Sequence, residues 1–478
     1  MTATADEIPT DAAPCGPRQL ESVLGPEHRA LTIGILAVVS LIAFEAMAVA
    51  TAMPVAVRDL DGLPFYSLAF SAFLTTSLVG MVVAGDVSDR RGPFLPFVVA
   101  VVTFGVGLVL SGLATSMWPF VLGRAIQGFG AGLNIVALYV VIGRAYPDVL
   151  RPRLFSAMAS AWVLPAIIGP FIAGVVADQL SWRWVFLAVP PLIVPAVLLM
   201  LPRMRSLGGS AAGPEVAAPA RRRTVPAIVA GVGVALLQYA GQRLDLVALG
   251  PLVAGAGMLV VSLPQLLPRG TLRARRGLPT TVLMRGILAG SFFGAETFVP
   301  LMLIEERGMA TALAGLTLTA GAVSWSIGSW IQGRPGTSVP RFRLILWGTG
   351  LVGVGIAALS LALWPELPPV VAGLGWMIAG LGMGLAMSSV NVVLLALSPA
   401  AEQGFNSAAL QFSDALGSIL FIGIGGAIFA GLHEGDGGNA AVFLLIYLLM
   451  AVIALAGATA APRVRARTAA TPATASVG

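Results

Sequence analysis

The stretch that decides the fold runs from Leu31 to Pro54 and reads LTIGILAVVSLIAFEAMAVATAMP. It is apolar apart from one carboxylate, Glu45, near its middle. An α-helix rises about 1.5 Å per residue, so roughly 20 apolar residues cross a hydrocarbon core of about 30 Å. A charge at the centre of such a helix costs roughly 2.5–3.5 kcal/mol on insertion scales. The stretch therefore predicts a membrane-spanning helix whose carboxylate has a partner, water or a bound proton.

The composition extends this prediction to the rest of the chain. Of the 478 residues, 57% are hydrophobic and only 10% are charged, whereas soluble domains carry about 25% charged residues. The deficit of charge recurs along the whole length, which predicts a polytopic membrane protein. The first apolar run is too long for the core of a cleavable signal and lacks a following cleavage site.

Apolar windows bounded by Gly, Pro or charge predict an all-α membrane protein with fourteen spans in a 6+2+6 arrangement. The windows are 31–54, 66–84, 94–114, 118–142, 154–177, 184–202, 225–241, 246–267, 279–304, 310–331, 344–364, 369–397, 404–431 and 440–461. In chain order the expected parts are a disordered tail (1–30), an N-terminal six-helix half (31–202), a linker (203–224), two extra spans (225–267), a C-terminal six-helix half (268–461) and a second disordered tail (462–478). Residues 225–267 could instead form one re-entrant hairpin.

A weak internal repeat supports two related halves. Gly34-Ile-Leu-Ala leads to Glu45 in the first window, and Gly286-Ile-Leu-Ala leads to Glu296 in the ninth. Both carboxylates fall at a similar depth in the first helix of a half. Transporters built from related halves hold their sites near the midplane between them.

The basic residues indicate how the chain is oriented. All 28 are arginine, and the net charge is +6. If the N-terminus lies inside and the chain alternates sides, most arginines fall in short inner loops, as the positive-inside rule requires. The charge therefore marks topology rather than a nucleic-acid surface. We expect a multi-pass protein of the cell membrane with both termini in the cytoplasm.

Other residue types exclude several function classes. Cys15 is the only cysteine and lies in the N-terminal tail, which excludes disulfides and cysteine metal sites. His28 and His433 lie in a tail and a loop, so a buried histidine relay is not expected. The sequence shows no nucleophile–base constellation, metal cluster or P-loop, so neither an enzyme, a cofactor nor direct ATP drive is predicted.

Three acidic residues lie clearly inside predicted spans: Glu45, Glu296 and Asp414. The helical rise places Glu45 about 13 Å, and Arg124 about 9 Å, from the outer ends of their helices. These depths permit an ion pair or a water bridge. We expect Glu45, Arg124, Glu296 and Asp414 to take part in proton coupling, because intramembrane charges are rare and expensive. The alternative is a structural pair between helices, or carboxylates satisfied by neighbouring hydroxyls and amides.

The segment after the second window reads Gly85-Asp-Val-Ser-Asp-Arg-Arg-Gly92. It resembles the G-x-x-x-D-R-x-G signature of the major facilitator superfamily, which lies between the second and third helices of that family. Gly85, Asp89, Arg90 and Gly92 match, while Pro93-Phe94 replaces the usual basic pair. The resemblance implies that this loop, including Arg91, ties the halves together on the cytoplasmic side of the outward-open form. A simple topology anchor is the alternative.

Two further stretches resemble patterns of the drug exporters and antiporters in that family. Arg124 to Ala131 reads RAIQGFGA and resembles its R-x-x-Q-G-x-G-A pattern, which implies a role for Arg124 in proton transfer. Gly169-Pro-Phe-Ile-Ala-Gly174 resembles the antiporter pattern G-P-x-x-G-G, with Ala173 replacing one glycine. Gly169, Pro170 and Gly174 could instead serve only to kink the helix and let a neighbour pack closely.

Two stretches at the ends of the first half point to one branch of the family. Ser181 to Phe186, SWRWVF, looks like the matching stretch of the fourteen-helix drug:proton antiporter branch. Glu45 and Met53-Pro54 fit a first-helix pattern of that branch in which an Asp lies nine residues before the proline of Leu-Pro, with Glu in place of Asp.

The resemblance implies two halves that rock about a central cavity and export hydrophobic or cationic small molecules in exchange for protons. The expected activity is multidrug efflux, with antibiotic resistance as its outcome. The expected partners are a lipophilic substrate, protons and the lipid bilayer, without nucleic acid, and the protein is expected to be monomeric. Alternatives are export of a lipid or secreted metabolite, a proton-coupled uptake symporter and a non-transporting sensor. The cavity candidates are Phe44, Gln127, Asn134, Trp162, Phe293, Trp325, Asn391, Gln411 and Phe412.

Overall fold

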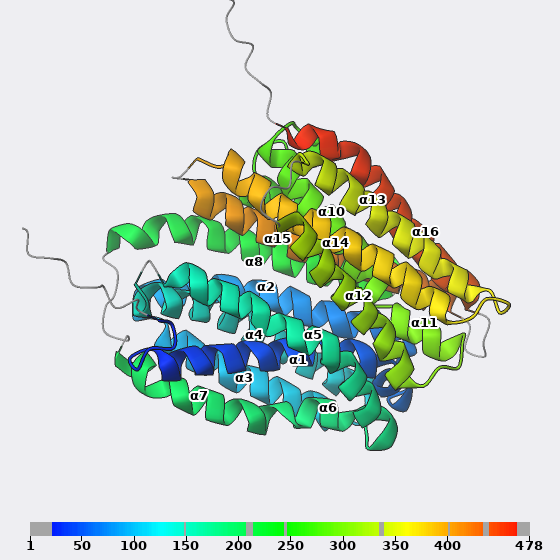
Figure 1. Cartoon of the computed structure of the whole chain (residues 1–478), viewed down its shortest axis with the longest axis horizontal. Coiled ribbons are helices and arrows are strands. Elements are labelled where there is room, and N and C mark those ends of the chain that lie inside the picture. The colour runs from blue at the N-terminus through cyan, green and yellow to red at the C-terminus, as the bar shows by residue number, and fades with distance from the viewer. Residues whose placement is uncertain are drawn as a thin grey trace, which may run out of the picture.

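The structure is a computed structural model, and it shows an all-α protein. It describes residues 22–147, 150–206, 214–242, 246–333, 339–399, 402–433 and 439–465. Over these residues the chain forms helices and short turns and no strand, as Figure 1 shows. The predicted fold class is confirmed. Most of the two expected tails lies outside the described residues.

The long helices follow the predicted windows closely. The first half contains α1 (Arg29–Asp59), α2 (Tyr66–Arg91), α3 (Phe94–Gly112), α4 (Met117–Ala145), α5 (Arg151–Gln179), α6 (Arg183–Leu187) and α7 (Val189–Ser206). Two extra helices follow, α8 (Pro214–Gln242) and α9 (Leu249–Leu266). The second half contains α10 (Leu278–Glu296), α11 (Val299–Glu305), α12 (Thr311–Gly333), α13 (Arg341–Leu359), α14 (Val370–Leu397), α15 (Gln403–Leu432) and α16 (Ala440–Ala460).

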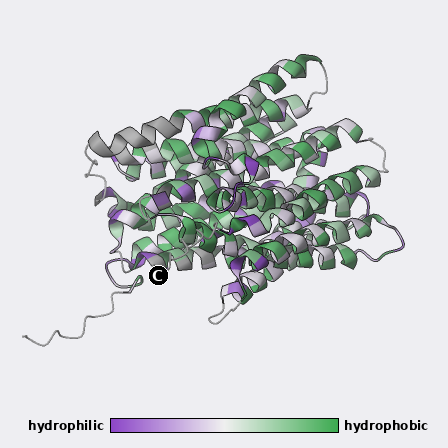
Figure 2. Cartoon of the chain, turned by 90° about the horizontal axis from the view of Figure 1, so that it is seen from above, coloured by the Kyte–Doolittle hydropathy of each residue, from purple (hydrophilic) through white to green (hydrophobic). Residues whose placement is uncertain are grey.

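Twelve segments of the described chain are long and apolar enough to span a membrane. The other two predicted spans fall on α8, whose apolar segment Val225–Gly241 is short, and on α12, which is 23 residues long but outside these twelve. Several Thr and Ser residues lower the hydropathy of α12. The helices therefore fit a count of twelve to fourteen spans, and the protein is a multi-pass membrane protein. Hydrophobic residues dominate the helices throughout (Figure 2).

The stretch expected as a linker is partly helical. Helix α7 continues to Ser206 and α8 begins at Pro214, so helix covers residues 214–224. The physical reason is the sequence from Pro214 onward, because proline is favoured in the first turn of a helix and Ala, Arg and Glu are strong helix formers.

The two halves repeat one packing scheme. In the first half α1 packs on α5, and α2 and α3 both pack on α4. In the second half α10 packs on α15, and α12 and α13 both pack on α14. Glycines allow the closest of these approaches: a Cβ at Gly132 would overlap the Ser77 carbonyl oxygen, and one at Gly384 would overlap that of Trp325. The weak sequence repeat thus corresponds to a repeat in the fold.

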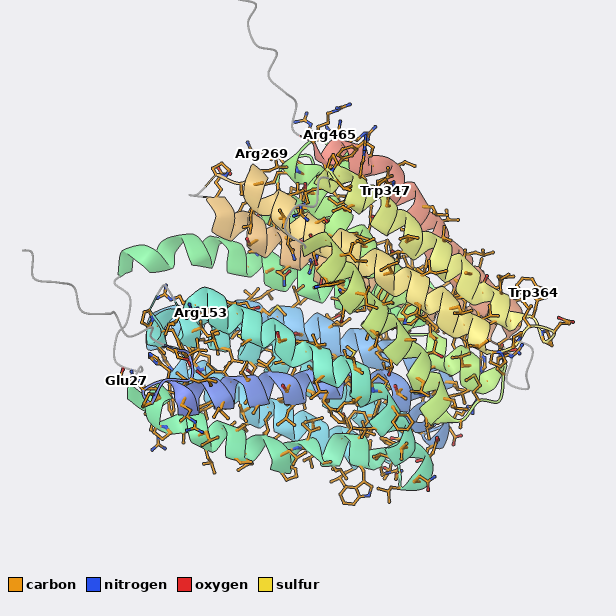
Figure 3. All side chains as sticks on the ribbon, in the orientation of Figure 1. Glu27, Arg153, Arg269, Trp347, Trp364 and Arg465 are labelled. Atoms are coloured by element: carbon orange, nitrogen blue, oxygen red, sulfur yellow. The ribbon has the colours of Figure 1, made fainter. Side chains whose placement is uncertain are left out.

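The chain ends define the two ends of the helical bundle. Helix α1 begins and α16 ends at one end, here called the termini end, and α1 ends with Asp59 at the opposite end. Figure 3 shows Glu27, Arg153, Arg269 and Arg465 toward the termini end and Trp364 at the opposite end.

The contacts that join the two halves include a set at the opposite end. The Tyr66 hydroxyl donates to the Thr297 carbonyl at 2.6 Å, and Arg58 Nη2 lies 3.2 Å from Glu305 Oε1. The Ala312 amide of α12 donates to Asp178 of α5 at 3.1 Å. These bonds hold the opposite ends of the halves together in this structure.

Helix α8 lies between the halves rather than beside one of them. It packs against α2 of the first half and against α15 of the second, and α9 packs on α8. Figure 1 shows α8 between α15 and α2. The two extra helices therefore cover one of the seams along which the halves meet.

Candidate functional site

A buried charged cluster joins α1, α2 and α4. Arg124 Nη1 lies 2.8 Å from Glu45 Oε1 and donates to Gln127 Oε1 at 2.6 Å. Its Nε donates to the Ala69 carbonyl at 3.4 Å, and its guanidinium carbon lies 4.5 Å from the centre of the Phe73 ring. The ion pair that the sequence analysis allowed is present, and the structure adds Gln127 and Phe73 to it.

The cluster is closed to its surroundings but incompletely bonded. Glu45 is 0% exposed and Arg124 is 3% exposed. Glu45 Oε2 and Gln127 Nε2 have no hydrogen-bond partner among the described residues. Removing one member of such a buried pair leaves an uncompensated charge, which costs about 3–5 kcal/mol. Because Oε1 holds Arg124 and Oε2 is unpaired, a proton can add to Glu45 at Oε2 while the bond to Arg124 stays.

A second charged cluster joins α10, α14 and α15. Arg285 Nε lies 2.6 Å from Asp414 Oδ1, and the same guanidinium donates to Asn391 Oδ1 at 3.1 Å and to Gln411 Oε1 at 3.4 Å. The side chains of Arg285 and Asp414 are 10% and 23% exposed. This pair is thus less enclosed than the first.

Arg285 is the functional candidate that the sequence analysis missed. The signal was available, because Arg285 interrupts the apolar run that begins the ninth window and a charge inside a span is as unusual for arginine as for a carboxylate. The sequence places it in or at the edge of that span, and it was given no role there. The structure places it in contact with three residues that were predicted separately.

Glu296 differs from the other two carboxylates. It is the last residue of α10 and is partly exposed. No ion pair or hydrogen bond joins its side chain to another described residue. Its helix is the counterpart of α1, but its arrangement is not a copy of the Glu45 cluster.

A cavity of about 430 Å³ lies among α1, α2, α4 and α5. Two predicted cavity residues, Asn134 and Trp162, line it. Asn134 is fully buried, and neither its Oδ1 nor its Nδ2 has a partner among the described residues. The lining is otherwise mostly apolar, and it includes Ile42, Phe73, Ser77, Leu138, Tyr139, Phe155 and Met158. A ligand that fits here would be largely apolar and would carry a group able to bond with the Asn134 amide.

The remaining cavity candidates are distributed differently. Phe293 and Trp325 lie in an aromatic cluster around Phe292, with ring centres 5.5 and 5.4 Å from it. Phe44 is half-buried and packs against the hydrophobic core. Phe412 is 7% exposed and packs in the hydrophobic core, and it does not line the cavity beside Asn134. The adjacent Gln411 is exposed and bonds to Arg285, since neighbouring residues of a helix point about 100° apart.

The expected loop between the second and third spans is helical. Helix α2 continues through Gly85 to Arg91, and Gly92 ends it with φ of 78°. Such a positive φ favours glycine, which explains Gly92. Arg91 is exposed, and the side chains of Asp89 and Arg90 lie outside the described residues. The predicted contacts of Asp89 and Arg90 with the second half therefore lie outside the described residues.

The motif on α5 lies where the halves meet. A Cβ at Gly174 would overlap the backbone of Ala312 on α12, and the Pro170 carbonyl occupies the space that a side chain at Gly315 would need. Gly169 has only ordinary contacts with Phe44 and Met47 of α1. These positions let α5 and α12 approach closely, which is the packing role that the sequence analysis gave as the alternative.

Comparisons with known proteins agree with this architecture. The family model described as Major Facilitator Superfamily matches residues 33–422. The multidrug transporter protein MdtP of Bacillus subtilis is 28% identical over 409 residues, which cover 83% of this chain and 74% of that protein. The multidrug efflux pump SdrM of Staphylococcus aureus is 22% identical over 372 residues, or 76% of this chain and 81% of that protein.

A solved structure supports the fold alone. A POT family transporter in complex with 5-aminolevulinic acid has a TM-score of 0.66 at 17% sequence identity. The match covers 93% of this chain and 99% of that one.

Proposed function

This chain belongs to the Major Facilitator Superfamily, and we propose that it exports lipophilic small molecules in exchange for protons. The family and its multidrug relatives are transporters. The proposal adds three finer statements: the direction of transport is outward, the driving ion is the proton, and the substrates are hydrophobic or cationic. The chain works as a monomer in the cell membrane, with the termini end in the cytoplasm.

One observation carries the proposal: a fully buried carboxylate, Glu45, keeps one oxygen on Arg124 and the other free. A purely structural pair would be expected to use both oxygens, because an unsatisfied buried acceptor costs about 1–3 kcal/mol. A carboxylate that must accept and release a proton has a reason to keep one oxygen unbonded. Glu45 is therefore the proton carrier in our proposal, and Arg124 holds its other oxygen in place.

The second charged cluster supports coupling in the other half. Asp414 and Arg285 join α15 to α10, and α15 faces the seam with the first half, where it packs against α2 and α8. We assign Asp414 and Glu296 as further proton sites, with Arg285 positioning Asp414. The substrate occupies the cavity beside Asn134 and Trp162, where an apolar wall favours lipophilic molecules.

The transport cycle follows from the contacts between the halves. In this structure bonds such as Tyr66 to Thr297 close the end opposite the termini, so the substrate would enter from the termini end. Opening the opposite end requires these bonds to break while the motif at Gly85–Gly92 closes the termini end. Moving one charge through 100 mV supplies about 2.3 kcal/mol, which is about fiftyfold in concentration. One or two protons therefore suffice to drive export.

Transport into inverted membrane vesicles tests this function. Vesicles energised with a proton gradient should accumulate lipophilic cationic dyes, and an uncoupler should abolish the accumulation. Arms with neutral drugs and with fluorescent lipids distinguish drug export from lipid export. Accumulation that persists in the uncoupler, or gradient-driven movement out of inverted vesicles, would contradict proton-coupled export.

A further inference from the structure

A groove of about 570 Å³ lies outside both charged clusters, between the two extra helices and α15. Its walls come from α8, from Leu246 and Ala248 just before α9, from Leu249 and Leu252 at the start of α9, and from Leu420 to Ala427 on α15. All of these residues lie toward the end opposite the termini. Leu246, Leu249, Leu252 and Ile424 are exposed, so the groove opens on the lipid-facing side of the bundle.

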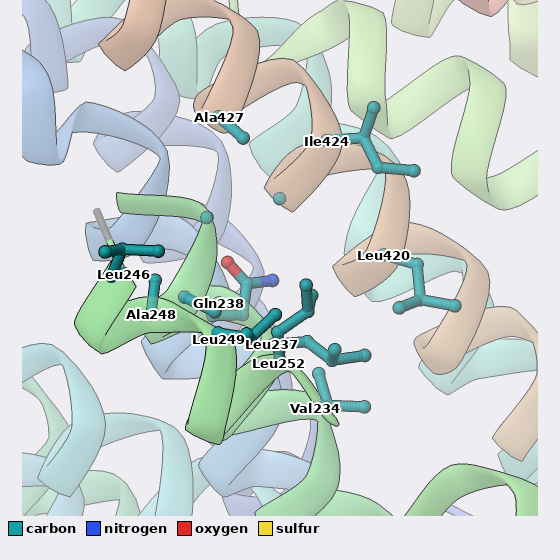
Figure 4. A pocket seen from close by; sticks show the side chains of 13 residues that line it. Val234, Leu237, Gln238, Leu246, Ala248, Leu249, Leu252, Leu420, Ile424 and Ala427 are labelled. Carbon is teal, nitrogen blue, oxygen red and sulfur yellow. The ribbon is translucent and has the colours of Figure 1, made fainter. Parts of the chain in front are cut away.

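Gln238 is the only polar side chain among the described residues that line this groove. It is 6% exposed, and Figure 4 shows its amide between the α8–α9 pair and α15. Its Nε2 donates to the Ile419 carbonyl at 2.8 Å, whereas its Oε1 has no partner among the described residues. A carbonyl can only accept, so the nitrogen must face Ile419 and the oxygen must face away from it.

The surrounding sequence holds the amide in this orientation. A Cβ at Gly423 would lie 2.7 Å from Gln238 Nε2 and 3.0 Å from its Oε1, so a larger residue there would displace the amide from its place against α15. Gly241 approaches α15 in the same way, since a Cβ there would lie 3.3 Å from the Ala427 Cβ. The packing therefore leaves one unpaired acceptor buried in the wall of an apolar groove, where a small movement of the amide would expose it.

The environment makes that unpaired acceptor expensive. In the hydrocarbon region there is no bulk water to bond with it, and an unsatisfied polar group there costs several kcal/mol. A molecule with a single hydroxyl or N–H group would satisfy the oxygen, and an aliphatic chain would fill the rest of the groove. Apart from Gln238, a charged headgroup would meet only aliphatic side chains and glycine, which disfavours it.

We propose that this groove is a second binding site, separate from the transport cavity, for a neutral aliphatic alcohol dissolved in the bilayer. The hydroxyl donates to Gln238 Oε1, and the chain lies against Leu249, Leu252 and Ile424. Because α8 packs on both halves, the bound molecule sits at the seam between them. The inference does not depend on which substrate the central cavity carries.

Photolabelling of the full chain in nanodiscs tests this site. The probe is a hexadecanol bearing a diazirine in its chain, and its matched partner is the methyl ether, which lacks the donor. Intact-mass and peptide mass spectrometry report the extent and place of labelling. The alcohol should label peptides of α8, α9 and α15 in the groove about fivefold more than the ether, as expected for one net hydrogen bond.

Four variants make the result decisive. Gln238→Leu should abolish the preference for the alcohol, while Gln265→Leu, which alters an exposed glutamine of α9, should leave it unchanged. Leu252→Trp should block labelling of the groove by both probes while keeping Gln238. Asn134→Leu, in the transport cavity, should leave the labelling of the groove unchanged. Equal labelling of the native protein by alcohol and ether, a preference that survives Gln238→Leu, or labelling only at other peptides would overturn the proposal.

Discussion

Glu45 and Arg124 show how burial raises the cost of removing one residue of an ion pair. The pair is buried on every side, with Glu45 0% exposed, whereas Asp414 in the second pair is 23% exposed in its side chain. Without its arginine, the charge of Asp414 can be solvated by water or neutralised by a proton more easily than the charge of Glu45. The two pairs should therefore respond differently when their arginines are removed.

Arg124→Gln should lower the free energy of unfolding by about 3–5 kcal/mol, because it leaves Glu45 uncompensated. Arg285→Gln should cost less, since Asp414 remains partly exposed. Thermal unfolding of the purified variants in detergent measures both effects. The double variant Glu45→Gln with Arg124→Gln should recover most of the loss. An equal loss for the two single arginine variants would contradict the difference in enclosure.

Asn134 makes a second prediction at this scale. Both of its amide atoms lack partners among the described residues, so Asn134→Leu should leave the substrate-free protein as stable as before, or more stable by about 1–3 kcal/mol. Binding of substrates that carry a donor or acceptor should weaken about tenfold, which corresponds to about 1.4 kcal/mol. Thermal unfolding and dye binding measure the two quantities.

Asn391→Leu is the matched control for that change. Asn391 accepts a hydrogen bond from Arg285, so its loss should reduce stability. A destabilised Asn134→Leu protein with unchanged substrate binding would show that the Asn134 amide is structural.

Residue chemistry could be predicted from the sequence where the residue type was rare. Glu45 and Arg124 stood out because charges in apolar runs are costly, and the structure brings them together. The grouping of Asn391, Gln411 and Asp414 around Arg285 could not be predicted, because it depends on how three helices pack. The burial of Phe412 in the core could not be predicted for the same reason, since sequence alone does not tell which face of α15 points inward.

At the scale of the helices, glycine sets how closely neighbours approach. A Cβ at Gly132 would overlap the Ser77 carbonyl oxygen between α4 and α2. In contrast, a Cβ at Gly105 of α3 would meet nothing within 4 Å. The two positions are both helical but only one is at an interface.

Gly132→Ala should therefore separate α2 from α4 and destabilise the protein by about 1–3 kcal/mol. Gly105→Ala should be neutral, or stabilising by up to about 1 kcal/mol through helix propensity. Thermal unfolding in detergent compares the stability of the two variants. A neutral Gly132→Ala would mean that the helices can move apart without loss, and that the close approach is not needed.

Helices could be predicted from the sequence better than their ends and their partners. Long apolar windows located α1 to α5 because only a helix satisfies every backbone group inside a bilayer. Their ends differ, since α2 continues through the Gly85–Gly92 motif and α8 begins at Pro214. The position of α8 between the halves has no signal in the apolar pattern, because every face of such a helix is apolar.

At the scale of the whole molecule, the bonds that close one end should set the balance between conformations. Arg58 joins Glu305 across the halves, and Tyr66 joins Thr297. Arg183 makes a comparable ion pair with Asp59 at 2.7 Å, but both residues belong to the first half. Of these three bonds only the first two join the halves, so they must break, together with the Ala312–Asp178 bond, when that end opens.

Arg58→Gln combined with Tyr66→Phe should raise the population opened at that end about fivefold, as expected for a loss of about 1 kcal/mol. Distances between spin labels on the ends of α1 and α11 measure this population. Arg183→Gln is the matched control and should leave the distances unchanged. An equal response of both variants would show that the contacts between halves do not set the balance.

The paired halves could be predicted in outline from the sequence, whereas their conformation could not. Repeated first-helix residues and the superfamily-like signature indicated two related halves, and the packing of α2 on α4 and α12 on α14 repeats. Which end is closed depends on small differences in free energy between two packings of one chain. No local pattern in the sequence encodes that difference.

The most direct test of the central claim, that Glu45 carries the coupled proton, is a pair of transport measurements on Glu45→Gln in proteoliposomes. Glutamine mimics the protonated acid and can still bond to Arg124, so exchange of substrate down its own gradient should persist. Uphill transport driven by a pH gradient should be lost, and Glu366→Gln, at an exposed loop position, should keep both activities. Uphill, pH-driven transport by Glu45→Gln at the native rate would contradict the account.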